Sequence, residues 1–175
     1  MRSFAFLFGC AVVVTSVPVL AAEPPIGEWL VKDGYAQVKV ENCSGALWGV
    51  ISWEARPGGR DNENPDSALR GRPVLGMPIL LDMKEKTVND WGTKEQRWVG
   101  HVYNSENGKT YDANVKLVKP NVMKLEGCVA GIFCGGQEWT RVVATTSGIQ
   151  SKGPAPKGQS KGGSAASDVC TRITH

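Results

Sequence analysis

The chain has 175 residues, which is enough for one domain with flanking segments and excludes a large multidomain enzyme. Apolar residues make up 41% of it and charged residues 21%, so a chain that is disordered throughout, or collagen-like, is also excluded. The net charge is +3 and its basic excess lies in the last 28 residues, away from the tryptophan-rich part, which disfavours a nucleic-acid-binding domain.

Residues 1–22 have the pattern of a secretory signal peptide. Arg2 supplies the positive start, residues 4–14 form an apolar run, and Ala21 and Ala22 end a small-residue cleavage region. Pro18 and its neighbours interrupt the run before it reaches the roughly 20 apolar residues that span a bilayer, so we expect no transmembrane segment. The sequence therefore predicts an exported protein.

Between residues 26 and 145, short runs of alternating apolar and polar residues are separated by turn residues, as in antiparallel strands. Closing such a sheet removes its exposed edges, so the pattern favours an all-β, antiparallel up-and-down barrel over a sandwich. One short turn of helix is expected at 63–70. The predicted strands, about eight in all, are 26–32, 35–41, 46–54, 74–81, 96–103, 111–117, 121–129 and 137–145.

The barrel domain is expected at residues 23–147 and is followed by a tail of different composition at 148–175. Of residues 148–167, fourteen of twenty are Gly, Ser, Pro or Lys, and such a segment buries too little apolar area to offset its ordering entropy. We therefore expect a disordered tail. Its four basic residues against one acidic residue allow only a weak, screened association with an anionic envelope surface.

The cysteines left after removal of the signal peptide are Cys43, Cys128, Cys134 and Cys170. Disulfides persist in exported proteins. Cys128 and Cys134 are close enough in sequence for a disulfide between them to cross-link a turn, so we expect them to pair. Cys43 and Cys170 are then either free or joined to each other. The chain has no Cys-x-x-Cys and its two histidines lie far apart, so we expect neither a metal site nor another cofactor.

The first and last predicted strands contain residues that we expect to pack against each other. Gly27-Glu28-Trp29 opens the first strand and Arg141 lies in the last, and these strands are neighbours in a closed barrel. The Arg141 guanidinium can then lie across the Trp29 indole and close one end of the barrel. This arrangement resembles the Gly-x-Trp and late Arg signature of lipocalin-like, or calycin, barrels.

A longer series of blocks, at 43–49, 61–66, 69–76 and 137–141, resembles the exported bacterial family catalogued as domain of unknown function 2147. The resemblance covers about residues 26–144. It implies a lipocalin-like barrel in a periplasmic or secreted bacterial protein, and it brings no established reaction. Members often have a second cysteine where this chain has Trp48, which leaves the partner of Cys43 open.

The most polar part of the domain is the segment from Arg56 to Arg72. Its acidic spacing does not fit an EF-hand, because Pro65 and Asp66 occupy positions that need an oxygen ligand and a glycine. We expect a loop over the barrel mouth, ordered by Asx turns and ion pairs, with a ligand gate as the alternative. The residues expected to build it are Asp61, Asn64, Asp66, Arg70 and Arg72.

The leading hypothesis for function is a noncatalytic binding module that holds one small, largely apolar ligand inside the barrel. In the alternative, the same aromatic residues fill a solid core, and the protein is a structural or interaction protein of the envelope. A hydrolase or isomerase built around His101 is a third hypothesis, which would need a nucleophile and an orienting carboxylate nearby. The candidate wall residues are Trp48, Trp53, Trp98, Tyr103 and Tyr111.

Overall fold

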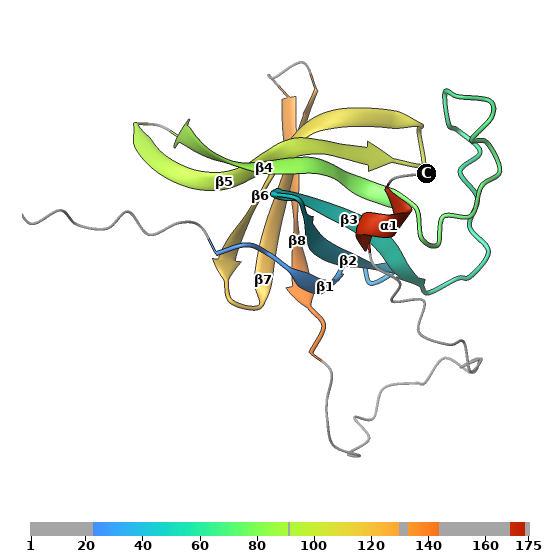
Figure 1. Ribbon diagram of the computed structural model, residues 1–175, viewed down its shortest axis with the longest axis horizontal. Coiled ribbons are helices and arrows are strands. Elements are labelled where there is room, and N and C mark those ends of the chain that lie inside the picture. The colour runs from blue at the N-terminus through green and yellow to red at the C-terminus, as the bar shows by residue number, and fades with distance from the viewer. Residues whose placement is uncertain (1–22, 91, 130–132, 144–168, 174–175) are drawn as a thin grey trace, which may run out of the picture.

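The computed structural model describes residues 23–90, 92–129, 133–143 and 169–173, which form a closed antiparallel barrel (Figure 1). Each strand pairs with the next in sequence, and β1 pairs with β8, so the predicted up-and-down barrel is confirmed. The segment 63–70 forms turns instead of helix. The elements are β1 Gly27–Leu30, β2 Ala36–Cys43, β3 Ala46–Glu54, β4 Pro78–Asp90, β5 Thr93–Asn104, β6 Lys109–Lys119, β7 Val122–Val129, β8 Phe133–Arg141 and α1 Val169–Arg172.

Strand alternation builds the core inside the barrel. In β2, Ala36, Val38 and Val40 are buried, while the residues between them are half-buried. The same period places Ala113 and Val115 of β6 in the interior. Because successive side chains of a strand point to opposite faces, one face of each strand contributes to the core and the other faces outward.

Trp29 and Arg141 close one end of the barrel, as expected from the sequence. Trp29 is 0% exposed, and the Arg141 Cζ lies 4.3 Å from the centre of its ring. The guanidinium also donates to the carbonyls of Ile26 at 2.6 Å and Pro120 at 2.9 Å. Gly27 has a φ of 125°, and a Cβ there would lie 2.7 Å from Arg141 Nη1, so only glycine lets the guanidinium approach. We call this the closed end.

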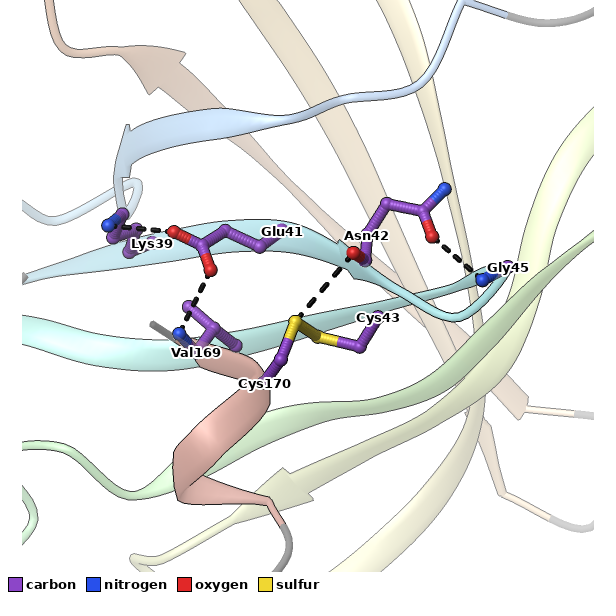
Figure 2. Close-up of a disulfide and its surroundings, with 7 residues drawn as sticks. All are labelled: Lys39, Glu41, Asn42, Cys43, Gly45, Val169 and Cys170. Atoms are coloured by element: carbon purple, nitrogen blue, oxygen red, sulfur yellow. Dashed lines mark hydrogen bonds and ion pairs between the residues drawn. A yellow bond between two sulfur atoms is a disulfide. The ribbon is translucent and has the colours of Figure 1, made fainter. Parts of the chain in front are cut away.

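The last described residues correct the prediction of a tail that is disordered throughout 148–175. Residues 169–173 contain α1, which lies against the outer face of β2 and β3, and Val169 is fully buried there (Figures 1 and 2). The Val169 amide donates to Glu41 Oε2 at 2.9 Å. Composition averaged over the tail missed this short apolar segment. Residues 144–168 and 174–175 lie outside the described residues.

Two disulfides join the described cysteines. Cys43 at the end of β2 is bonded to Cys170 of α1 across 127 residues of sequence, with a Cα to Cα distance of 5.4 Å (Figure 2). This is the joined form of the two alternatives that the sequence left open. Cys128 and Cys134 face each other in the register of β7 and β8 and are bonded, as expected. No helix among the described residues is long and apolar enough to cross a membrane.

Candidate functional site

At the end of the barrel opposite the Trp29 and Arg141 plug, the interior widens into a cavity of about 1040 Å³. This open end is surrounded by the connections β1–β2, β3–β4 and β5–β6. The volume is at the upper end of the range usual for ligand pockets, roughly 300 to 1,000 Å³. The barrel is therefore not solid at its open end. Its apolar lining includes Val31, Ala36, Ile51, Val74, Ile79, Val102, Leu125 and Trp139.

Two glycines that face each other create part of this space. Gly127 of β7 pairs directly with Gly135 of β8, and both line the cavity. Residues paired across antiparallel strands share a face, so both positions that would carry inward side chains here are bare. A Cβ at Gly127 would lie in ordinary contact with Val102 Cγ1 at 3.4 Å, and a Cβ at Gly135 would meet nothing within 4 Å. The cavity has room here because neither glycine places a side chain in it.

Of the five predicted wall residues, the structure places Tyr103 and Tyr111 at the cavity and the other three elsewhere. Trp48 pairs with Glu41, whose side chain lies on the outer face beneath α1, so Trp48 faces outward as well. Trp53 faces outward because of a bulge: the register passes from Ile51 directly to Trp53 and skips the residue between them. One extra residue in a strand places the residues after it on the opposite face from the one that simple alternation predicts.

Trp98 is buried, but it contributes to a different hollow, of about 970 Å³. That hollow lies beside β4, β5 and β6, and its lining also includes Lys116, Leu117 and Pro120. Trp98 therefore does not belong to the lumen cavity. The prediction of Trp98 as a wall residue of the ligand site is corrected accordingly.

Trp139 is a buried aromatic residue of the cavity wall that the sequence analysis did not predict. It is 2% exposed, lines the cavity, and its indole Nε1 has no hydrogen-bond acceptor among the described residues. The signal was present, because Gln137 and Trp139 alternate with the exposed Glu138 in the last strand.

The polar segment between β3 and β4 is held by a buried network around Asp61. The carboxylate is 0% exposed and accepts hydrogen bonds from Tyr103 Oη at 2.6 Å, Asn64 Nδ2 at 2.8 Å and Arg72 Nε at 2.9 Å. Arg72 also lies over the Tyr103 ring, 5.9 Å from its centre. The remaining predicted loop residues order turns: the Asp66 carboxylate accepts from the Ala68 amide. Arg70 Nε donates to the Asn64 carbonyl at 2.7 Å.

This loop supports the cavity wall and does not cover the mouth. Of the predicted segment Arg56–Arg72, all of which the structure describes, only Arg56 lines the cavity, so the segment does not form a lid over the mouth. It is attached through Tyr103, which belongs to the cavity wall. It is also packed on the β5–β6 turn, where a Cβ added to Gly108 would overlap the Glu63 carbonyl. The expected Asx turns and the ion pair are present, and they hold the loop in a fixed conformation that supports the cavity wall.

The electrostatics of the network follow from its burial and its donors. Burial alone would raise the Asp61 pKa, but the hydrogen bonds from Tyr103, Asn64 and Arg72 outweigh burial and hold the pKa below its usual value. Burial and the hydrogen bond to the Asp61 carboxylate raise the pKa of Tyr103 to about 12. At neutral pH the carboxylate is therefore charged and the phenol is neutral.

We expect Asp61→Asn to lower the free energy of unfolding by about 3 kcal/mol at pH 7, because it weakens three buried bonds to a charged acceptor. A carboxyl whose folded pKa is depressed stabilises the fold above its unfolded pKa, about 4, and loses that contribution as the pH falls through the folded value. The difference between wild type and variant should therefore shrink below about pH 4. Urea unfolding at several pH values measures it, and a difference that does not depend on pH would contradict the assignment.

His101 lies outside the cavity. Its side chain is 54% exposed, and its Nε2 lies 3.4 Å from Asp112 Oδ1, a carboxylate that is itself mostly exposed. The pair sits on the outer surface of β5 and β6. The described residues also contain no group of three or more His, Cys, Asp or Glu that could hold a metal ion. The geometry gives no support to the His101 hydrolase or isomerase hypothesis.

A closed eight-stranded up-and-down barrel with a cavity at one end is the architecture of lipocalin-like proteins. The chain belongs to the bacterial family described as "Uncharacterized protein conserved in bacteria (DUF2147)", which it matches over residues 27–141. The resemblance found in the sequence is confirmed.

One solved structure similar to the chain is described as "Protein HP1028 from the human pathogen Helicobacter pylori belongs to the lipocalin family". The TM-score is 0.58 at 19% sequence identity, and the match covers 70% of this chain and 85% of that one. At this identity the likeness shows the fold alone. No curated protein matches the chain.

Proposed function

We propose that this protein is an exported, noncatalytic binding protein that holds one small, largely apolar ligand in the cavity at the open end of the barrel. The observation that carries the proposal is the cavity itself, of about 1040 Å³, with an inner wall of aliphatic side chains and Trp139. A barrel whose function was only structural would gain stability by filling this space, since close-packed interiors are the rule. The paired glycines at 127 and 135 keep it unfilled instead.

Export is supported by the two disulfides and by the N-terminal sequence pattern. The noncatalytic assignment rests on the lining, which combines an apolar interior with a polar rim and includes no histidine or cysteine among the described residues. A small apolar molecule would gain its affinity from burial in such a space, and the polar rim would set its orientation.

The direct test fills the cavity from a position that tolerates a side chain. Gly135→Phe should abolish binding of the neutral, apolar fluorescent probe N-phenyl-1-naphthylamine, because the new ring projects into space where a Cβ meets no atom within 4 Å. Stability should be unchanged or slightly higher. The matched control is Glu138→Phe, which adds the same ring to an exposed position of the same strand. Saturable probe binding that survives in Gly135→Phe, or no binding to the wild type, would contradict the proposal.

A further inference from the structure

The rim of the cavity is acidic on three sides. Asp33 comes from the β1–β2 turn, Glu54 from the end of β3 and Glu106 from the β5–β6 turn, and all three line the cavity. Arg56 is the one basic residue among the described lining residues. The lining therefore has an excess of negative charge at its mouth, although the whole chain is weakly basic, with a net charge of +3.

These three carboxylates, of Asp33, Glu54 and Glu106, form no ion pair with any cation of the described residues. In contrast, Glu95 and Glu126 of the outer face are both paired with Arg97. Unpaired carboxylates around an apolar cavity leave a negative potential that a bound molecule meets first.

Aromatic surface lies beside these acids. Tyr35, on the rim, is 52% exposed, and Tyr111 lies in the same lining with its hydroxyl accepting from Asn107 Nδ2 at 2.9 Å. Burial raises the pKa of Tyr35, and the charges of Glu106 and Asp33 raise it further, so two carboxylates from different turns act at this one position. An aromatic face together with carboxylates is the combination that recognises organic cations.

We infer that the ligand is a cationic amphiphile, with its apolar body in the lumen and its amine or quaternary ammonium group at the rim formed by Asp33, Glu54 and Glu106. The inference rests on the proposed function, since it assigns the head group of the same ligand. A carboxylate head group, as in a fatty acid, would be repelled at this rim. A neutral head group would gain hydrogen bonds from the rim but no attraction to its charge.

The test compares three ligands that share one tail: dodecylammonium, dodecanol and dodecanoate, titrated calorimetrically below their aggregation concentrations at low salt. We expect dodecylammonium to bind about tenfold more tightly than dodecanol, and dodecanoate to bind about tenfold more weakly, which is the scale of two unscreened surface charges. The contrast should shrink at higher ionic strength, where the screening length falls to roughly 8 Å at 0.15 M.

The rim variant Asp33→Asn/Glu106→Gln should bring the three affinities together by weakening dodecylammonium and strengthening dodecanoate. The control Asp112→Asn/Glu138→Gln removes the same charge from exposed positions outside the lining and should leave the order unchanged. Equal affinities, tighter dodecanoate binding or an equal effect of both double variants would overturn the cationic head group while the proposed binding function stands. If none of the three ligands and no apolar probe binds, the binding function itself fails.

Discussion

Replacing Cys43 and Cys170 by serine should lower the free energy of unfolding of the oxidised protein by about 5 kcal/mol. The disulfide closes a span of 127 residues, and in the chain-entropy account a loop of this length restricts the unfolded chain strongly. The variant also weakens the attachment of α1, whose Val169 is fully buried. Denaturant unfolding, with both proteins oxidised, measures the difference.

The second disulfide provides the matched control. Cys128 and Cys134 are only 6 residues apart, so replacing both by serine should cost about 2 kcal/mol by the same account. Under reducing conditions the Cys43→Ser/Cys170→Ser variant and the wild type should be equally stable. An oxidised-state loss smaller than that of the short disulfide would show that α1 is not covalently held to β2.

Trp29→Ala should cost about 3 to 5 kcal/mol, the range for truncation of a large buried aromatic side chain. Trp29 is 0% exposed, and its loss removes the ring over which Arg141 lies, as well as the indole donor to the Pro25 carbonyl at 2.9 Å. The closed end would then lose its cover. The comparison is with Trp48→Ala, because Trp48 lies on the outer face and is only half-buried.

Chemical denaturation of both tryptophan variants decides this prediction. Trp48→Ala should cost clearly less than Trp29→Ala, since its side chain leaves no comparable cavity. A loss below about 1 kcal/mol for Trp29→Ala, or equal losses for the two variants, would contradict the closure of the barrel by Trp29 and Arg141.

The barrel could be predicted from the sequence because its determinants are local. Alternation in segments such as 111–117 gives each strand its inward face, and closure then makes Trp29 and Arg141 neighbours, which the register confirms. The Cys128 to Cys134 bond followed from proximity in the chain. Each of these inferences needed only the side-chain period and the connection of successive strands.

The parts that could not be predicted depend on register and on contacts distant in sequence. The bulge opposite Gln37 turns Trp53 outward, and no sequence signal marks it. Asp61 and Tyr103 are 42 residues apart in the sequence and are joined by a hydrogen bond only in the folded chain. The support that the loop gives to the cavity wall could therefore not be predicted from the sequence. The docking of α1 depends on Val169 and Cys170, which a compositional average over the tail conceals.

Tryptophan fluorescence quenching by 12-bromododecanol tests whether an apolar ligand enters the lumen at the open end of the barrel. Bromine quenches an indole at contact. Trp139 lines the cavity, whereas Trp48 lies outside it. We expect saturable quenching that is largely lost in Trp139→Phe and retained in Trp48→Phe. No saturable quenching, or quenching that Trp139→Phe leaves as strong as Trp48→Phe does, would contradict entry of the ligand into the lumen.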